Sequence, residues 1–196
     1  LAVVHKPSGY PTNGNYFKTI ENTLTYNLKR SSEMDSLPYP QTVHRLDNLT
    51  SGVLVTAKTQ SAKSLLSIMF EKRKVKKSYT AIVEGKPNSE GGIIESAIHQ
   101  KDSKTTYQVK TSIEKHSETY TMLELWPETG RTHQLRIHLA SIGHPIVGDQ
   151  LYGAQKENLN LFLHATTIGF IHPKTHKRLT LKTNLPHKFR KFMDCL

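Results

Sequence analysis

The chain has 196 residues, of which 36% are hydrophobic, and this is enough for one well-packed domain with at most a small appendage. Lys and Arg number 27 against 16 Asp and Glu, so the formal net charge is +11, and the excess is spread along the sequence. Distributed positive charge favours a polyanionic partner, although a merely basic protein is the alternative. The only cysteine, Cys195, excludes an internal disulfide and a cysteine metal cluster.

No apolar run approaches the roughly 18 residues that a membrane span requires. The first residues also lack the basic head and long apolar stretch of a signal peptide. We therefore expect a soluble, cytoplasmic protein that has no membrane contact and acts as a monomer. Because residue 1 falls inside an apolar run without a methionine, we expect the natural chain to continue upstream.

In chain order, the apolar run at 1–6 predicts a strand that ends in a turn at Pro7–Gly9. Residues 29–40 are polar, contain two prolines and show no period, which predicts a loop. The run at 52–58 predicts a buried strand. Apolar residues at helical spacing within 60–74 predict a helix with a solvated basic tail. Its predicted apolar face comprises Ala62, Leu65, Leu66, Met69 and Phe70.

The segments 76–85, 105–113 and 118–126 are rich in β-formers and predict antiparallel strands in the middle of the chain. Two later strands are predicted at 161–172 and 178–183. These elements predict an α+β class, with a mainly antiparallel mixed central sheet flanked by helices and loops. We expect one domain over residues 1–196.

Two further helices are predicted in the second half of the chain. Thr132 is expected to cap a helix that ends at Gly143, which places Arg136 on its first turns. The apolar face of that helix comprises Leu135, Leu139 and Ile142. A last helix is predicted from Pro186, with Phe189, Phe192 and Met193 at helical spacing.

The segment HRLDNLTSG, residues 44–52, is the strongest candidate for reaction chemistry. It places Asp47 between a basic pair, His44 and Arg45, and a polar turn. The alternative for Asp47 is a carboxylate that merely caps this turn. A nearby arginine such as Arg136 would keep the acid ionised and would favour catalysis.

Arg131, Thr132 and His133 stand at a predicted helix start, where main-chain N–H groups and the helix dipole favour an anion. They are candidate phosphate contacts. Capping and surface solvation are the alternative explanation for these three residues.

Four segments in order, HRLDNLTSG, KKSYTAIVEG, TGRTHQLRIHLASIGHPIVGDQLYG and LFLHATTIGFIHP, resemble the RluA-type RNA pseudouridine synthases. The opening AVVHKPSG resembles the first motif of that family. The resemblance covers nearly the whole chain. It implies the pseudouridine synthase fold and the isomerisation of a uridine within RNA, with no cofactor and no metal.

The resemblance also implies roles for single residues. Asp47 matches the essential aspartate, Tyr79 the tyrosine that stacks on the target base, and Arg136 the arginine that pairs with the aspartate. Leu163 matches an apolar residue near the base, and Arg45 is assigned to RNA binding with the phosphate candidates above. We expect structured RNA as the partner, ribosomal RNA rather than transfer RNA, with the target base flipped out.

Two alternatives from other classes stay open. An RNA-binding module of the same fold without turnover would not need Asp47, Tyr79 and Arg136 together. A metal-dependent hydrolase would need clustered acids, yet the aspartates are far apart in sequence. They are Asp47, Asp102, Asp149 and Asp194. Histidines also give no metal spacing, because His133 and His138 are five residues apart and no HExxH occurs.

Overall fold

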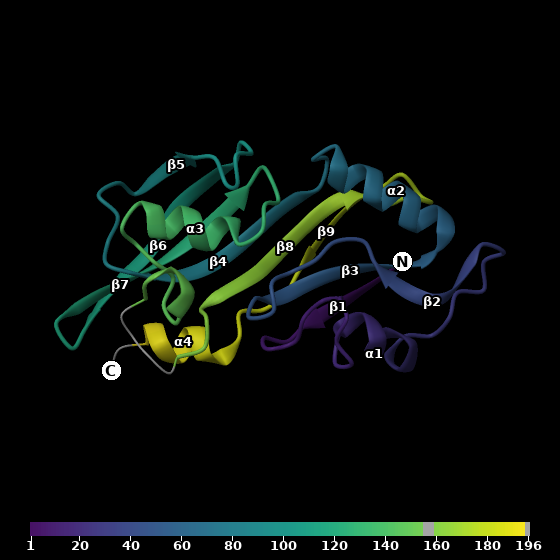
Figure 1. Cartoon of the computed structure of the whole chain (residues 1–196), viewed down its shortest axis with the longest axis horizontal. Helices are drawn as coiled ribbons and strands as arrows, with labels where there is room; N and C mark the ends of the chain where they lie inside the picture. The colour runs from purple at the N-terminus through teal and green to yellow at the C-terminus, as the bar shows by residue number, and fades with distance from the viewer. Residues whose placement is uncertain (155–158, 195–196) are drawn as a thin grey trace. The chain divides into compact units, whose positions relative to one another are not determined.

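The computed structural model describes residues 1–154 and 159–194, so Cys195 lies outside the described residues. The described residues form two compact units (Figure 1). Unit 1 consists of Leu1–Lys76 and Thr167–Thr183, and unit 2 consists of Lys77–Thr166 and Asn184–Leu196. Helices and mainly antiparallel strands confirm the α+β class. In the described part of the chain, no helix combines the length and the apolar composition needed to cross a bilayer.

The strands of unit 1 centre on β3 (Ser51–Thr59), whose residues are almost all buried. Its antiparallel partners include β1 (Ala2–Lys6) and β2 (Ser36–Thr42). The strand β9 (Arg178–Lys182) pairs with β8 (Leu163–Ile171). β8 supplies its first residues to unit 2 and its last residues to unit 1. The strands predicted at 1–6, 52–58, 161–172 and 178–183 are confirmed.

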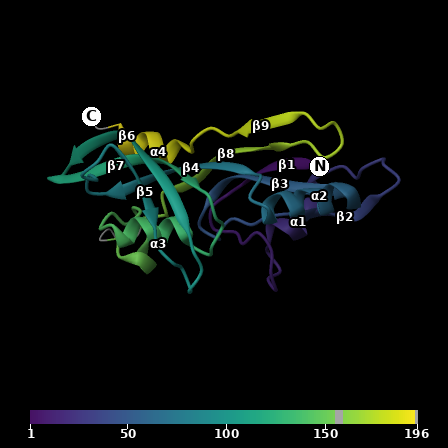
Figure 2. The ribbon, with the colours of Figure 1, turned by 90° about the horizontal axis from the view of Figure 1, so that it is seen from above.

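Unit 1 has two helices, α1 (Ile20–Asn27) and α2 (Gln60–Glu71), on the opposite side of its strands from β9 (Figure 2). Each begins after a threonine whose hydroxyl oxygen accepts a main-chain N–H of the first turn, Thr19 for α1 and Thr59 for α2. α2 buries Ala62 and Leu66 against the strands, but Leu65 is 40% exposed. The predicted apolar face is therefore wrong at Leu65.

The loop predicted at 29–40 is wrong at its end, because β2 begins at Ser36. β2 pairs only with β3, and its register shifts between Ser36 and Gln41. A strand with one partner tolerates Pro38 and Pro40, since the missing N–H groups can face away from the ladder. The two prolines therefore mark an edge strand.

The strands of unit 2 are hydrogen-bonded in the order β8-β4-β7-β6-β5. The bounds are Lys76–Glu84 for β4, Gly91–Glu95 for β5, Lys104–Lys115 for β6 and Glu118–Pro127 for β7. The pairs of β4 with β7, β7 with β6, and β6 with β5 are antiparallel. The three strands predicted in this region are confirmed, whereas β5 was not predicted.

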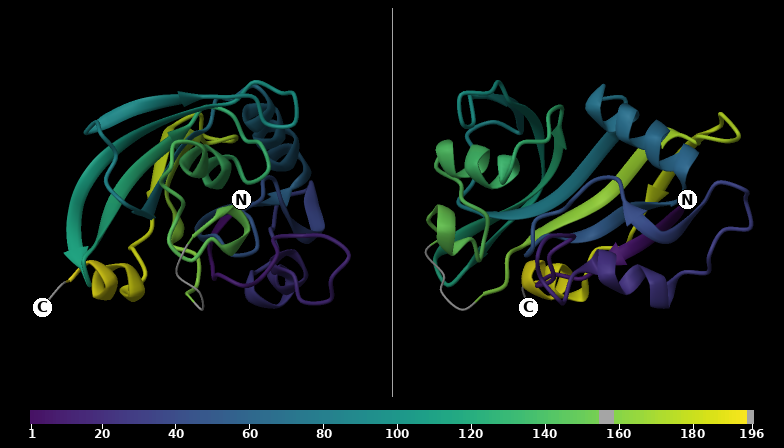
Figure 3. Two further views of the ribbon diagram at one scale, coloured as in Figure 1. Left: turned by 60° about the vertical axis from the view of Figure 1, so that its left-hand side comes forward. Right: turned by 45° about the vertical axis from the view of Figure 1, so that its right-hand side comes forward.

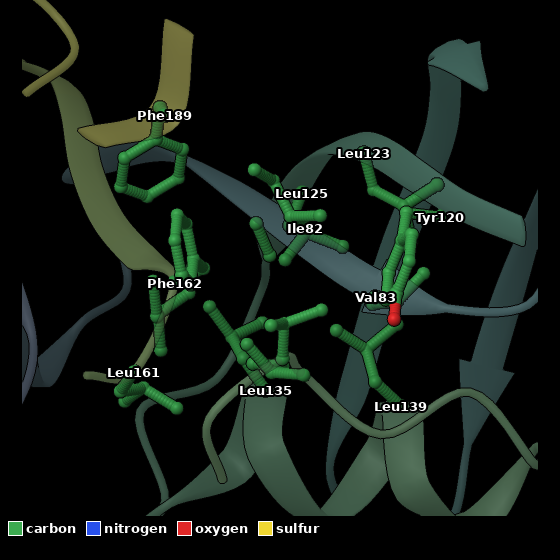
Figure 4. Packing of buried hydrophobic residues seen from close by; sticks show 14 of the residues in the cluster. Ile82, Val83, Tyr120, Leu123, Leu125, Leu135, Leu139, Leu161, Phe162 and Phe189 are labelled. Carbon is green, nitrogen blue, oxygen red and sulfur yellow. The ribbon is translucent and has the colours of Figure 1, made fainter. Parts of the chain in front are cut away.

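The core of unit 2 joins these strands to α3 (Gln134–Ser141) and α4 (His187–Met193) (Figure 4). Leu135 and Leu139 of α3 point into the core, and Phe189 of α4 packs edge-on against Phe162 at 5.3 Å between ring centroids. Burial of each large side chain contributes about 1.5 to 3 kcal/mol. This core fixes where α3 begins, and α3 carries Arg136.

Charge is divided unequally between the two units. Unit 1 contains fifteen Lys and Arg against five Asp and Glu, whereas unit 2 contains twelve against eleven. Nearly all of the net charge of +11 therefore belongs to unit 1. A polyanion is attracted by unit 1 far more strongly than by unit 2.

Candidate active site

Asp47 lies in the connection between β2 and β3 of unit 1. The connection closes with a turn in which the Thr50 N–H donates to the main-chain oxygen of Asp47 at 3.0 Å. Leu46 is buried and anchors the connection, whereas Asp47 is half-buried and Arg45 is exposed. The side chain of Asp47 thus follows an anchored residue and precedes a hydrogen-bonded turn.

The Asp47 loop is held by the segment that follows β1. The Gly9 N–H donates to the Asn48 carbonyl at 3.0 Å, and the Ser8 hydroxyl donates to the Leu49 carbonyl at 2.6 Å. The Thr12 hydroxyl donates to the Leu46 carbonyl at 2.8 Å and accepts the Leu46 N–H at 3.1 Å. Each of these bonds reaches main chain of the loop, so none of them depends on the side chains of Asn48 and Leu49.

Lys6 completes this clamp from inside the unit. Its side chain is fully buried, and Nζ donates to the carbonyls of Asn48 and Pro7, each at 2.9 Å. Burial lowers the pKa of Lys6 to about 8, and the negative charge of Asp47 opposes this shift. The ammonium group is therefore mainly protonated at neutral pH. We call Lys6, Ser8, Gly9 and Thr12 the loop clamp; sequence reasoning saw only a structural corner there.

Replacing Lys6 by methionine, which keeps the buried stem but removes the donor, is expected to lower kcat for pseudouridine formation about 10- to 100-fold, because a reactive group misplaced by about an ångström loses that much. The KM for RNA should change little. Lys72→Met, at an exposed lysine of the same unit, is the matched control. Equal kcat values in both variants would remove Lys6 from a positioning role.

His44 was predicted as half of a basic pair beside Asp47, and this interpretation is wrong. Its Nε2 atom accepts the Val55 N–H at 2.9 Å, which a doubly protonated ring cannot do. The ring also stacks on Phe70 with 4.5 Å between centroids. His44 thus ties the Asp47 loop to β3 and α2.

Arg136 lies in the first turn of α3 in unit 2 and is 5% exposed. Its guanidinium forms a fork with Asp149, from Nε to Oδ2 and from Nη2 to Oδ1, both at 2.7 Å. It also lies over the ring of Tyr152, with 4.9 Å to the centroid. Sequence reasoning missed Asp149 as a partner. Asp47 belongs to the other unit, and its pairing with Arg136 stays a prediction.

A tight turn brings Asp149 to this position. Gly148 has φ of +79°, and a Cβ there would lie 2.7 Å from the carbonyl oxygen of Leu159. The Asp149 N–H donates to the Ile146 carbonyl, and the Asp149 carbonyl accepts the Ala154 N–H. Only glycine fits at Gly148, so the turn that delivers the carboxylate is fixed locally.

The start of α3 differs from the prediction. The residue that caps the helix is His133, not Thr132, and it adopts the left-handed conformation with φ of 54°. Thr132 is exposed. A non-glycine residue held there costs about 1 to 3 kcal/mol, and such residues cluster at functional sites. His133 Nδ1 forms a hydrogen bond of 2.9 Å with the hydroxyl of Tyr152, and the two rings pack edge to face. Tyr152 is also the residue whose ring lies under the guanidinium of Arg136.

Gln134 braces the segment before α3. Its Oε1 atom accepts the Thr129 hydroxyl at 2.6 Å and the Arg131 N–H at 3.0 Å. Its Nε2 atom donates to the Lys104 carbonyl at 2.9 Å. The guanidinium of Arg131 donates to the Asp102 carbonyl, from Nη2 at 3.1 Å. The phosphate contacts assigned to Arg131, Thr132 and His133 stay predictions.

His138 is fully buried and takes part in a hydrogen-bond chain. Gln134 donates to the Thr105 hydroxyl oxygen, which also lies 2.9 Å from His138 Nδ1. Nε2 then donates to Ser103 Oγ at 2.9 Å, and Ser103 donates to the Ser96 carbonyl. Burial lowers the pKa of His138 and so favours a neutral ring, whose Nδ1 accepts from the Thr105 hydroxyl.

This histidine should make the fold sensitive to acid. A histidine pKa below its unfolded value of about 6.5 means that the unfolded chain binds the proton first, so stability falls as the pH drops below about 6.5. The free energy of unfolding of the wild type, measured by urea at pH 7.5 and 5.0, is expected to fall more than that of His138→Asn. The other histidines cancel in this comparison. Equal losses in the two proteins would contradict the assignment.

Tyr79 and Leu163 lie on neighbouring strands of unit 2. Tyr79 is half-buried in β4, opposite Leu125 of β7, and packs against the core. Leu163 begins β8 and belongs to that core. Their predicted contacts with a target base stay predictions. Within the described ranges, no three His, Cys, Asp or Glu side chains gather in a way that could hold a metal ion.

Residues 1–141 match the RNA pseudouridylate synthase family. The chain belongs to this family. It is 35% identical to the uncharacterized RNA pseudouridine synthase YhcT of Bacillus subtilis, over 95% of the chain and 66% of that relative. It is 34% identical to the dual-specificity RNA pseudouridine synthase RluA of Vibrio vulnificus, over 90% of the chain and 76% of that protein.

A third relative is the ribosomal large subunit pseudouridine synthase D of Zymomonas mobilis, at 34% identity over 95% of the chain and 67% of that protein. Among solved structures, human RNA pseudouridylate synthase domain containing 4 matches with a TM-score of 0.77 at 25% identity, over 96% of the chain and 86% of that structure. The RluA-type resemblance, the fold and membership of an isomerase family are confirmed. The chain spans about two thirds of the length of the first of these curated relatives.

Proposed function

We propose that this protein isomerises a uridine within structured RNA to pseudouridine, with Asp47 as the catalytic group and the target base turned out of its stack. The reaction breaks the bond from N1 of uracil to C1′ and forms one from C5 to C1′. C5 loses a proton and N1 gains one, so nothing is oxidised and no outside group is transferred. A held carboxylate that acts as nucleophile or base is sufficient for such a step.

The observation that carries this proposal is the loop clamp around Asp47. The clamp fixes the main chain on both sides of the aspartate through Leu46 and Asn48. A rigid main chain with a half-buried carboxylate suits a group that must meet one atom of a bound nucleoside. The Asp47 carboxylate can attack C1′, add to the ring or remove the 2′ proton, and all three remain consistent with the clamp.

The other residues have proposed roles around that step. Arg136, oriented by Asp149 and Tyr152, would pair with Asp47 and keep it ionised. Tyr79 would stack on the everted base, an interaction worth about 1 to 3 kcal/mol, with Leu163 beside it. Arg45, Arg131, Thr132 and His133 would contact RNA.

Ribosomal RNA is the proposed substrate. The support for it is that the names of two relatives specify the large ribosomal subunit. A single catalytic domain, acting as a monomer in the cytoplasm without a small-molecule cofactor, is part of the same proposal. The net charge of +11, concentrated in unit 1, supports a polyanionic substrate.

The decisive experiment maps pseudouridine in RNA from cells that lack the gene and then adds the purified protein to that RNA in the presence of a chelator. We expect one or a few uridines to be converted. Binding without conversion would support an RNA-binding module instead. Strand cleavage that needs a divalent metal would support a hydrolase, and either result would overturn the proposal.

A further inference from the structure

Exposed aromatic side chains are confined to one part of unit 1. Among the described residues, every exposed Phe, Tyr or Trp lies between positions 10 and 39. They are Tyr10, Tyr16, Phe17, Tyr26 and Tyr39. Phe17 is 93% exposed and Tyr26 is 90% exposed, far more than a single scattered apolar residue requires.

Three of these residues belong to α1 or to the turn that leads into it. Asn22 of α1 donates from Nδ2 to the carbonyls of Tyr16 and Phe17, at 3.2 and 3.0 Å, so the turn that carries both rings is tied to the first turn of the helix. Tyr26 is four residues after Asn22, hence on the same side of α1 and one turn further along. Figure 3 shows the segment before α1 lying beside that helix. We call Tyr16, Phe17 and Tyr26 the aromatic platform.

Basic and acidic side chains both occur in the stretch that carries the platform, residues 10–39. Lys18, Lys29 and Arg30 are exposed in this stretch. Its three carboxylates are each engaged within unit 1. Glu21 accepts from Thr42, Glu33 pairs with Lys174 at 2.6 Å, and Asp35 accepts the Ser61 N–H at 2.8 Å.

The platform is also tied to the Asp47 loop. The segment that carries it closes on itself, because the N–H groups of Ile20 and Glu21 donate to the carbonyls of Pro11 and Thr12. Thr12 is a member of the loop clamp. Tyr16 is four positions after Thr12, which limits the distance between their Cα atoms to about 14 Å. The platform therefore begins within about 14 Å of a residue that is hydrogen-bonded to the Asp47 loop.

We propose that the aromatic platform binds single-stranded RNA beside the target uridine, with bases stacked on Tyr16, Phe17 and Tyr26 and a phosphate at Lys18. Rings beside basic side chains are the usual surface for unpaired nucleotides, because every base has a face to stack. A protein partner is less suited, since the exposed Lys18 and Lys29 would be buried against it and lysine is depleted at protein–protein interfaces. This inference rests on the proposed function, because it assumes that the target uridine binds at Asp47 and that the neighbouring nucleotides extend from there to the platform.

The test compares binding of a fluorescein-labelled, mixed-sequence single-stranded RNA of about twelve nucleotides with binding of the same RNA as a duplex. Tyr16→Ala/Phe17→Ala/Tyr26→Ala is expected to weaken the single strand about 10- to 100-fold and the duplex less than about twofold. Phe17→Leu keeps an apolar side chain without a ring and should lose about as much affinity as Phe17→Ala. Leu65→Ala/Ile68→Ala, on exposed apolar residues of α2, is the matched control.

Far-UV circular dichroism and the Tm show whether each variant folds, and the exposure of these side chains predicts that all do. Wild-type affinity of the triple variant for the single strand would overturn the inference, as would equal losses for single strand and duplex. Full affinity in Phe17→Leu would indicate an apolar docking surface instead of stacking and would overturn it too. Pseudouridine formation by the wild type is scored separately, so failure of the proposed function is distinguished from failure of the platform.

Discussion

Replacing Asp47 by asparagine is expected to abolish pseudouridine formation, with a loss of at least about 1,000-fold in turnover. An amide of the same size is neither a nucleophile nor a base in this reaction. The loop should keep its shape, because the loop clamp holds main chain and the closing turn uses the Asp47 carbonyl. Conversion of RNA from cells lacking the gene, quantified at the mapped uridine, measures the effect.

The same variant should bind RNA within a few-fold of the wild type, because phosphate contacts contribute most of the affinity and lie elsewhere. Glu71→Gln, at an exposed carboxylate in the same unit, is the control and should keep full activity. Turnover in Asp47→Asn near the wild-type rate would end the catalytic assignment. A lower Tm of Asp47→Asn together with a loss of RNA binding would show that Asp47 stabilises the folded structure instead.

Replacing Asp149 by leucine is expected to lower the free energy of unfolding by about 3 to 5 kcal/mol. The change removes both oxygens of the fork from the guanidinium of Arg136, which is 5% exposed. Urea denaturation of the wild type and the variant measures the difference. Turnover should fall as well, because Asp149 orients Arg136.

The double variant Arg136→Met/Asp149→Leu separates charge from packing. Without the arginine there is no buried guanidinium for the fork to compensate, so most of the stability should return while activity stays lost. Arg136→Lys keeps the charge but cannot form both bonds of the fork, so its stability should lie between the other two. A loss below about 1 kcal/mol in Asp149→Leu alone would mean that the fork is not what holds Arg136 in place.

Regular periodicity made most of the fold predictable. The strand at 52–58 is a continuous apolar run, the strand at 76–85 is rich in β-formers, and the helix near 60–74 has apolar residues at helical spacing. The helix α1 was missed because only Ile20 and Leu24 of its eight residues are buried. β2 was missed because its prolines indicate a loop unless the strand is known to lie at an edge.

The candidate site was predictable only where its residues are neighbours in the sequence. Asp47 and Arg136 stand in dense motifs, but the residues that hold them do not. Asp149, which binds Arg136, is 13 positions from it in the sequence, and Lys6, which holds the Asp47 loop, is further still from Asp47. A buried lysine beside an apolar strand and a glycine–aspartate pair after a helix give no periodic signal. The start of α3 was misplaced because a left-handed His133 has no propensity signature.

The loop clamp separates the geometry of the loop from its chemistry. Since the clamp holds carbonyls and one N–H of Leu46, Asn48 and Leu49, the exposed side chains of Asn48 and Leu49 can be exchanged without moving the carboxylate beside them. A library randomised at these two positions is therefore expected to keep the Asp47 carboxylate in place while the outer contacts of the loop vary. Selection from such a library is a route to enzymes that modify a chosen transcript.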